Sequence, residues 1–558
     1  MSARIVERRR SRGLWRALSK GASAGIVAIG LNFLLRIGGL APFPPEAATE
    51  AFIRIIPASI QEPSVQAVGD FAGELGLLVA TAVAIAVYGI FGIIFEKAYA
   101  PRAARVGRLS RYEKFLVFSF IPWLFFGLVI FPSAGSSVFG ISSSLASGYA
   151  IISFPLILLL VQLIYGVALY WEYKGTDILI SDAQMPSSSS SSAPNLPSPT
   201  SRRQFLEKGA LGVAALALAA VSLDQLVPSL LSGSGSNLPS GTSYDPSSGP
   251  AIFQDPRLAP LVNSEVTSNA NFYRVAIDIF DPSVNAANWS LQLAGLIGTQ
   301  KSYSIADLKN LPSAEQYTTF ECVSNNVNGN LISNAKWSGM RISDLFQNAG
   351  GAQPRASWVV FYSVDGYSVG IPMSKAMMSD SILAYGMNDA DLPTRHGYPL
   401  RAVIPGYYGM MSAKWINKIE LADSPYSGYW QTRGWTQNAV VNTLAFISIP
   451  GDGASVSLSK NKGSVMLGGV AFAGDRGISK VEISVDGGNT WQEAQLKPPI
   501  SNLTWSLWAY EWTPAKTGSY NVYARATDGT GALQTSVQTP TFPNGATGYA
   551  GISINVEI

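Results

Sequence analysis

The sequence contains one cysteine and one histidine in 558 residues, and only 13% of its residues are charged. A single cysteine excludes an intrachain disulfide. No Cys-x-x-Cys-His motif occurs and the long apolar runs contain no histidine, so we expect no haem. The net charge is +3, and the basic residues crowd into a few N-terminal segments instead of marking a folded domain. This distribution argues against a nucleic-acid partner.

Long apolar segments are abundant, because hydrophobic residues make up 47% of the chain. A bilayer is crossed by roughly 20 apolar residues. Four runs approach or exceed that length: residues 21–40, 73–95, 115–131 and 149–171. They predict an α-helical transmembrane module over residues 1–172. The segments at residues 1–20 and 96–114 are rich in arginine and lysine, which predicts a multi-pass protein of the cell membrane with a cytoplasmic N-terminus.

A Ser/Pro-rich stretch at residues 173–200 is interpreted as a flexible cytoplasmic linker, because it has too few apolar residues to offset its ordering entropy. Residues 201–232 then combine Arg202 and Arg203 with an Ala-rich apolar segment. We interpret them as a twin-arginine export signal that forms a fifth span; an ordinary fifth span flanked by two arginines is the alternative. Both interpretations put the following residues outside the cytoplasm. The twin-arginine route carries folded proteins, typically with a bound cofactor, so a cofactor is implied.

The remaining residues, 233–558, show the patterns of short strands and turns. Residues 233–436 mix short β-like runs, turn dipeptides and helical segments, which predicts a mixed α+β domain. Residues 437–558 alternate apolar and polar positions around Asp-Gly turns at residues 486–488 and 528–530. That pattern is typical of an immunoglobulin-like β-sandwich.

Cys322 follows a predicted strand, "QYTTFE", and precedes a predicted loop, "VSNNVNGN". A lone cysteine is most often a small buried hydrophobe; a catalytic nucleophile, a reactive surface thiol and a thiolate metal ligand are the other interpretations. Further along, "RHGYPLRAVIPGYYGMMSAKW" combines His396, Arg401 and Lys414 with several glycines. Glycine lets backbone approach a ligand closely, and arginine with lysine is the usual pair for phosphate. This stretch therefore predicts a site for a phosphorylated cofactor.

Together the two stretches resemble the sulfite oxidase family of molybdopterin-dependent oxidoreductases. Members of that family have a cysteine and an Asn-containing loop after a strand, followed by Trp-x-Gly, as in "ECVSNN…KWSGMRISDLF" here. They also have His-Gly-x-Pro-x-Arg, Pro-Gly and Ser-x-Lys-Trp, which match residues 396–401, 405–406 and 412–415. The resemblance runs from about residue 271 to the C-terminus, and it includes the C-terminal dimerisation domain of the family.

The resemblance implies a molybdenum–molybdopterin cofactor, with tungsten as an alternative metal, and it makes Cys322 the protein ligand to that metal. It places four residues in the catalytic part of the site: Cys322, Arg274, Trp435 and Tyr426. It places eight residues at the pterin and its phosphate: Tyr273, Arg274, Asn325, Asp365, His396, Arg401, Ser412 and Lys414. Ordinary turn or surface roles are the alternative for these residues, chiefly for Asp365 and Ser412. A homodimer through the C-terminal domain is implied as well, with a membrane-held monomer as the alternative.

The sequence departs from the family pattern at positions where sulfite oxidases have residues for the substrate. Asn326 and Val327 stand where sulfite oxidases have arginines, and "TFPNGATGY" stands where they have an arginine in Trp-Asn-x-Arg-Gly. Trp435 replaces a tyrosine that donates to substrate, although Tyr426 and Tyr429 lie nearby in the sequence. Loss of bidentate arginines weakens the attraction for a dianion such as sulfite. We therefore expect a small-molecule substrate that is neutral or less charged.

These observations predict a membrane-anchored oxidoreductase that transfers an oxygen atom at an extracytoplasmic molybdenum centre. Because no haem is expected, electrons would pass to or from a separate carrier: a cytochrome, a copper protein or a quinone-linked partner. The alternative reaction within the family is reduction of a sulfoxide or an N-oxide. The alternative from another class of protein is a metal-free, membrane-tethered binding module. The thiol of Cys322 beside predicted phosphate-binding cations argues against the binding module.

Overall fold

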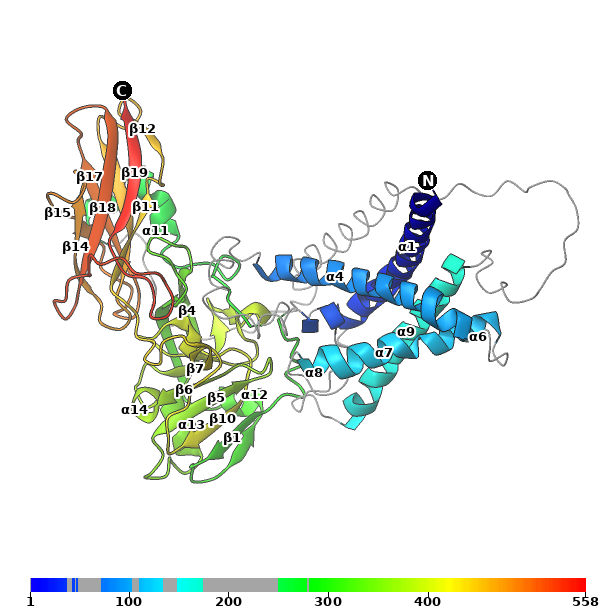
Figure 1. The fold of residues 1–558 in the computed structure, drawn as a ribbon. Helices are drawn as coiled ribbons and strands as arrows, with labels where there is room; N and C mark the ends of the chain where they lie inside the picture. Colours follow the sequence, from blue (N-terminus) through cyan, green and yellow to red (C-terminus); the bar gives the residue numbers. More distant parts are fainter. Residues whose placement is uncertain are drawn as a thin grey trace, which may run out of the picture. The chain divides into compact units, whose positions relative to one another are not determined.

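The computed structural model describes residues 2–37, 43–45, 47–48, 72–102, 110–133, 148–173, 249–277 and 281–558. The chain forms two compact units, one of residues 1–57 with 71–233 and one of residues 58–70 with 234–558 (Figure 1). All but the first residue of the predicted linker, 173–200, and all of the predicted export signal and fifth span, 201–232, lie outside the described residues.

The first unit is helical. Its main elements are α1 (Ser2–Ile37), α4 (Ala72–Ile94), η2 (Phe95–Tyr99), α6 (Arg111–Phe118), α7 (Phe120–Phe125), η3 (Phe126–Ile130), α8 (Phe131–Ser133) and α9 (Gly148–Tyr173). Within the described residues, four helical segments are long and apolar enough to cross a membrane: Gly13–Leu35, Leu78–Arg102, Tyr112–Ile130 and Pro155–Tyr173. The prediction of four apolar N-terminal helices is confirmed, although the first segment begins earlier than residue 21.

Small residues bring α1 and α4 close together. A Cβ atom at Gly21 would lie 2.8 Å from the Gly92 Cα, and one at Gly25 would collide with the Tyr88 side chain. This Gly-x-x-x-Gly spacing permits the close backbone approach on which helix association in lipid depends. Tyr88 in turn donates a hydrogen bond of 3.0 Å to the Gln162 side chain of α9. Larger residues at either glycine would separate the two helices.

The second unit begins with two five-stranded sheets. The first has the order β2 (Lys301–Tyr303), β1 (Leu291–Gly295), β10 (Ile416–Ala422), β5 (Trp358–Ser363) and β6 (Ser368–Pro372). The second has the order β3 (Ser313–Glu321), β4 (Ile332–Arg341), β7 (Ile382–Met387) and β8 (Ala390–Asp391), with β9 (Arg401–Val403) also paired to β7. The short helices α12 (Ile305–Lys309), α13 (Ile342–Asn348) and α14 (Met373–Ala376) connect strands, so this part is a mixed α+β domain as predicted.

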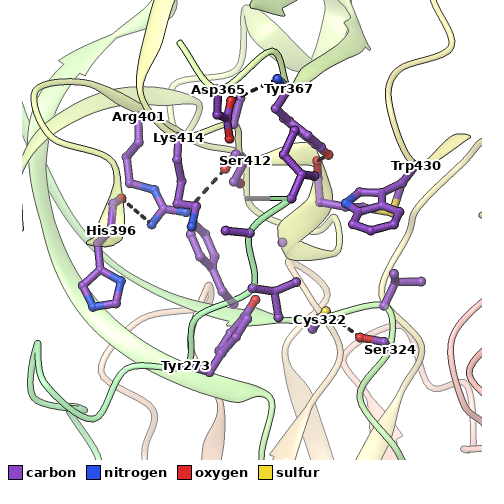
Figure 2. Close-up of a pocket in the computed structure, with 18 of the residues that line it drawn as sticks. Tyr273, Cys322, Ser324, Asp365, Tyr367, His396, Arg401, Ser412, Lys414 and Trp430 are labelled. Carbon is purple, nitrogen blue, oxygen red and sulfur yellow. Dashed lines mark hydrogen bonds between the residues drawn. The ribbon is translucent and has the colours of Figure 1, made fainter. Parts of the chain in front are cut away.

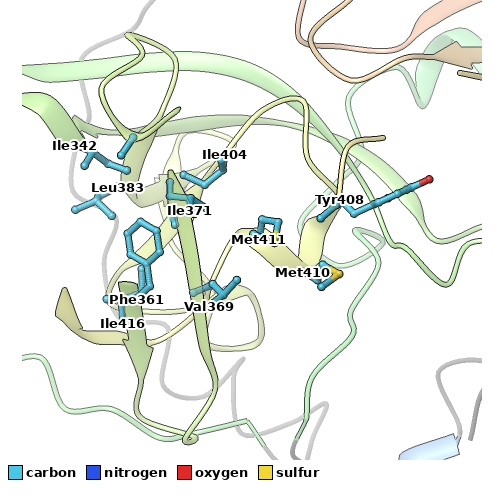
Figure 3. Close-up of a cluster of buried hydrophobic side chains, with 14 of the residues drawn as sticks. Ile342, Phe361, Val369, Ile371, Leu383, Ile404, Tyr408, Met410, Met411 and Ile416 are labelled. Carbon is cyan, nitrogen blue, oxygen red and sulfur yellow. The ribbon is translucent and has the colours of Figure 1, made fainter. Parts of the chain in front are cut away.

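Apolar side chains from both sheets form one core in this domain (Figure 3). Phe361 of β5 and Ile416 of β10 contribute from the first sheet, and Leu383 of β7 contributes from the second. All three side chains are fully buried. At roughly 1.5–3 kcal/mol for each buried large apolar side chain, this core holds the two sheets, and hence the loops between them, in fixed positions.

The C-terminal residues form an all-β domain of two sheets, as predicted. One sheet has the order β11 (Leu444–Ile449), β13 (Val465–Phe472), β17 (Ser506–Trp512) and β16 (Gln495–Leu496). The other has the order β12 (Ser455–Ser457), β19 (Ala550–Glu557), β18 (Gly518–Asp528), β14 (Ile478–Ser484) and β15 (Gln492–Glu493). Buried and partly exposed residues alternate along most of β18, which is the pattern of a strand with one face on a core. The boundaries at residues 233 and 437 stay predictions.

The segment before the α+β domain packs on the sandwich. Leu258, and Leu261 of α11 (Ala259–Asn263), lie against Gly468 of β13. Arg257 makes a 2.7 Å ion pair with Glu511 of β17. A second ion pair, 2.8 Å long, joins Glu265 to Lys497, and both side chains are 1% exposed. The α+β domain and the sandwich are therefore joined by this segment within one compact unit.

Replacement of Lys497 by alanine should destabilise the second unit by about 3–5 kcal/mol, because it leaves the Glu265 carboxylate buried without its cation. Urea unfolding of the full-length protein, followed by tryptophan fluorescence, measures the change. The matched control is Lys480→Ala, which removes a 3.1 Å pair with Glu482 whose lysine is 39% exposed. That variant should lose at most about 1 kcal/mol. Equal effects of the two substitutions would contradict the prediction.

Candidate cofactor site

A cavity lies between the C-terminal end of β3, the N-terminal end of β9 and four surrounding loops (Figure 2). The loops span residues 272–277, 365–367, 409–415 and 430–435. About 1040 Å³ of space inside the cavity and its mouth is free of protein atoms. Segments separated by more than 150 residues in the sequence therefore meet around one cavity.

Cys322 is the residue after β3, and its side chain lines the cavity while being only 7% exposed. Its backbone N–H donates to the Leu331 carbonyl at 2.9 Å, and its carbonyl accepts from the Asn325 N–H at 3.0 Å. Its sulfur lies 3.0 Å from the Ser324 hydroxyl oxygen. The thiol is thus held at a defined position facing the cavity. Its burial argues against a reactive surface thiol.

Asn325 closes the turn that carries Cys322 and is not among the residues that line the cavity. Its Oδ1 accepts from the Leu331 N–H at 2.9 Å, and its Nδ2 donates to Glu321 Oε1 at 3.1 Å. Burial raises the pKa of the Glu321 carboxyl to about 8, so the group is protonated at neutral pH. Asn325 therefore supports the cysteine loop. We did not predict a role for Glu321, because the residue order does not show that its carboxyl is buried.

Arg401 is a buried cation at the opposite side of the cavity from Ser324 and Trp430 (Figure 2). Its guanidinium donates to the carbonyls of His396 at 3.0 Å and Ser412 at 3.4 Å. It also lies 4.8 Å from the ring centre of Phe320 and 4.7 Å from that of Trp337.

No acidic side chain in the described part of the chain lies within 4.0 Å of the Arg401 guanidinium. Burial lowers its pKa to about 9, which leaves it charged at neutral pH. A buried charge is costly unless it is paired, so this arrangement favours an anionic ligand in the cavity.

Lys414 and Ser412 line the cavity near Arg401. The Lys414 ammonium donates to the Arg395 carbonyl at 3.4 Å and lies 4.2 Å from the Trp415 ring centre. Burial lowers its pKa, and the nearby Asp281 and Asp365 carboxylates oppose that shift. The Ser412 hydroxyl accepts from the Ile404 N–H at 3.1 Å, so its own hydrogen is available to a ligand.

His396 lies beside these cations with its imidazole 1% exposed. Nε2 lies 2.7 Å from the Asn269 carbonyl, which can only accept, so Nε2 carries the proton and Nδ1 is an acceptor. Burial lowers the pKa of the imidazole to about 3, and the Arg401 and Lys414 charges add to this effect. The ring is therefore neutral at physiological pH. The chain's only histidine is a hydrogen-bonding group in this site and carries no charge there.

Asp365 lines the cavity, whereas Arg274 does not. The Asp365 Oδ1 accepts from the Tyr367 N–H at 3.0 Å, and burial raises the pKa of its carboxyl to about 6. Arg274 makes an ion pair with Asp281, with distances of 2.8 and 3.0 Å to the same carboxylate oxygen. Sequence reasoning missed Asp281 because it lies outside both motif stretches. The Arg274 guanidinium is therefore paired with the Asp281 carboxylate and does not line the cavity in this structure.

Tyr273 lines the cavity between the sulfur and the cations (Figure 2). Burial raises the pKa of its phenol well above the ordinary value, and the nearby Cys322 and Glu321 add to this, so the hydroxyl stays protonated. Gly409 lies against this hydroxyl, and a Cβ atom there would collide with it. Any larger residue at position 409 would displace Tyr273.

Three aromatic residues also line the cavity. They are Trp435, whose catalytic role stays a prediction, and Trp430 and Tyr367, which we did not predict. Tyr367 donates to the Met410 carbonyl at 2.6 Å. Tyr426 is not brought to the cavity, because its hydroxyl lies 2.9 Å from the Ser368 hydroxyl. Its close position in the sequence did not correspond to a place in the site.

Cys322 brings a sulfur to the cavity as a possible metal ligand. The described residues contain no cluster of three or more histidine, cysteine, aspartate or glutamate side chains that could hold a metal ion. A metal at Cys322 would therefore need most of its ligands from a chelating cofactor. Such a cofactor with a phosphate would also neutralise Arg401 and Lys414. The residues present thus fit a metal-chelating, phosphorylated cofactor, with Cys322 on the metal and Arg401, Lys414, Ser412 and His396 at its other end.

Two family models match the second unit. Residues 279–430 match the oxidoreductase molybdopterin binding domain, and residues 433–541 match the Mo-co oxidoreductase dimerisation domain. The class is thus a molybdopterin-binding oxidoreductase with a C-terminal dimerisation-type domain.

Sequence similarity to known proteins identifies the family of this chain. The chain is 29% identical to mitochondrial sulfite oxidase of Rattus norvegicus over 50% of this chain and 59% of that protein. It is 28% identical to sulfite oxidase of Arabidopsis thaliana over 50% of this chain and 85% of that protein. It is 31% identical to the uncharacterized oxidoreductase YuiH of Bacillus subtilis over 26% of this chain and 72% of that protein. The chain belongs to the sulfite oxidase family of molybdopterin-dependent oxidoreductases. It spans little more than half the length of the animal relatives that it matches.

The neutral state of His396 can be tested directly because the chain has one histidine. In tag-free, histidine-labelled protein, the imidazole NMR signal should not titrate between pH 8 and 5, since its pKa is lowered to about 3. In urea the same signal should titrate near about 6.5. The unfolded state then binds the extra proton, so stability should fall as the pH drops from about 6.5 toward 3. A folded-state midpoint above pH 5.5 would contradict this.

Proposed function

We propose that this protein is a membrane-anchored molybdopterin-dependent oxidoreductase that transfers an oxygen atom to or from a neutral substrate at an extracytoplasmic site. The observation that carries the proposal is the placement of a buried thiol and a buried arginine cation on opposite sides of one cavity. The family membership supports the cofactor. The four apolar helices and the arginine-rich segments that precede and connect them support the membrane anchor and the orientation.

When bound, the cofactor supplies two-electron chemistry in which an oxygen atom passes between water and substrate. Oxidation of a lone-pair atom in this way takes one oxygen from water and releases two protons and two electrons. Arg401, Lys414 and Ser412 would bind the phosphate and pterin edge, and Cys322 would bind the metal. The neutral His396 offers Nδ1 as an acceptor, and the protonated hydroxyl of Tyr273 offers a hydrogen-bond donor within the cavity.

The lining of the cavity supports a neutral substrate. Many of its residues are apolar or aromatic: Val275, Ile277, Val323, Met410, Trp430 and Trp435. The cationic side chains that line the cavity are Arg401 and Lys414, which lie on the side away from Trp430 and Ser324 in Figure 2 and would be neutralised by the cofactor. Apolar surface favours a small molecule such as a sulfide, sulfoxide or N-oxide over a dianion. Reduction of a sulfoxide or N-oxide and oxidation of the corresponding neutral compound use the same contacts.

Electron exchange would involve a separate carrier, because no haem motif occurs in the sequence. The match to a dimerisation domain supports a homodimer. A metal-free binding module is disfavoured, because such a protein would gain nothing from a buried cation that lacks an acidic partner among the described residues.

Cys322→Ser should abolish turnover and lower the metal content at least tenfold while pterin is retained, because the phosphate contacts lie elsewhere in the cavity. Metal analysis and fluorescence of the extracted pterin measure the two contents. The reciprocal control is Arg401→Gln, which should lose pterin and metal together. Retention of turnover in Cys322→Ser would contradict the proposal, as would wild-type protein without molybdenum or tungsten from a host that makes the cofactor.

Substrate class is tested with purified, metal-loaded, full-length protein and redox dyes. Sulfite, dialkyl sulfides, sulfoxides and N-oxides are compared under identical conditions. We expect kcat/KM for a neutral compound to exceed that for sulfite at least about 100-fold, because each missing charge-assisted bond is worth roughly 1.5–3 kcal/mol. Turnover of sulfite with a micromolar KM would contradict the neutral-substrate proposal and leave the cofactor assignment intact.

A further inference from the structure

Ser324 lies beside the sulfur that would bind the metal, and the family resemblance assigned it no role. Its hydroxyl oxygen is 3.0 Å from the Cys322 sulfur, and its side chain lines the cavity (Figure 2). That contact joins residues two apart in the chain, so it depends on the conformation of one turn and on the rotamers of the two side chains.

The turn is determined by several independent contacts. The Asn325 N–H donates to the Cys322 carbonyl, and the Cys322 N–H donates to the Leu331 carbonyl. The Asn325 side chain then ties the two ends of the loop together, accepting from the Leu331 N–H at 2.9 Å and donating to Glu321. A Cβ atom at Gly329 would lie 2.5 Å from Asn325 Oδ1, so this position requires glycine. These contacts hold the backbone positions of Cys322 and Ser324 in the turn, and the two side chains then meet at 3.0 Å.

The direction of the hydrogen bond follows from the chemistry of the ligand. A cysteine bound to a metal is a thiolate, which has no proton to donate. The hydroxyl must then be the donor, and the bond becomes charge-assisted. Beyond the proposed function, on which this step rests, we propose that Ser324 is a positioning residue that donates a hydrogen bond to the Cys322 thiolate and raises the reduction potential of the bound metal.

The electronic effect has a definite sign. A hydrogen bond to a ligating thiolate withdraws electron density from the sulfur, which then donates less to the metal. The oxidised metal carries the higher charge and loses more stabilisation than the reduced metal. The reduced state is therefore favoured. Since the bond is made by a residue on the cysteine loop itself, this effect is independent of the substrate.

The test compares Ser324→Ala, which removes the donor, with Ser324→Thr, which keeps it. Full-length protein of each kind is titrated against dyes of known potential, and the one-electron-reduced metal is followed by EPR. Ser324→Ala should have a lower midpoint potential, equivalent to a roughly tenfold lower ratio of reduced to oxidised metal at a fixed dye potential. Ser324→Thr should keep the wild-type value. Metal and pterin contents should match the wild type in both variants.

An unchanged potential in Ser324→Ala with normal metal content would overturn the inference and leave the proposed function standing. The same shift in both variants would also overturn it, because a change common to alanine and threonine does not arise from the hydroxyl. So would loss of the metal from Ser324→Ala, since a tuning contact does not decide occupancy. Wild-type protein without molybdenum or tungsten would instead refute the proposed function, and this inference with it.

Discussion

A buried positive charge that lacks a nearby acidic partner is the constraint on which the site depends. The Arg401 guanidinium is 4% exposed, and the described protein groups around it are carbonyl oxygens and aromatic faces. Carbonyl dipoles and ring quadrupoles reduce the cost of burying the charge without cancelling it. An anion in the cavity would complete the arrangement. His396 beside it is kept neutral by burial and by the nearby cations, so it adds no further positive charge.

The thiol imposes the complementary constraint. One sulfur cannot hold a transition metal by itself, and the described residues add no cluster of ligating side chains. A chelating cofactor with an anionic group satisfies both requirements at once, since its chelating end meets Cys322 and its anion meets Arg401. The loop from Cys322 to Leu331 then acts as a rigid support, in which Asn325 fixes the sulfur without touching the cavity. Rigid support of a metal ligand keeps its distance and its electronic character constant.

The lining of the cavity is the basis of the proposed neutral substrate. Many of its residues are apolar or aromatic, and Arg401 and Lys414 lie on the side away from Trp430 in Figure 2. Under the proposed function, a substrate would exchange water for apolar surface and would gain little from charge. The buried pair of Glu265 and Lys497 and the shared core keep the α+β domain and the sandwich in one unit, so the loops of the site rest on a continuous framework.

Much of the architecture could be predicted from short stretches of the sequence. Hydropathy over about 20 residues sufficed for the four apolar helices, and the order of short motifs sufficed for the two domain types and for the placement of Cys322, His396, Arg401, Ser412 and Lys414 at one cavity. Contacts between distant segments decided the rest. Arg274 is held by Asp281, and Tyr426 is turned toward Ser368. The contacts of Trp430 and Glu321 were not visible in the residue order either. Hydropathy and motif spacing describe a segment and its neighbours, whereas a side chain's partner is set by the packing of both sheets, and only the tertiary structure contains that information.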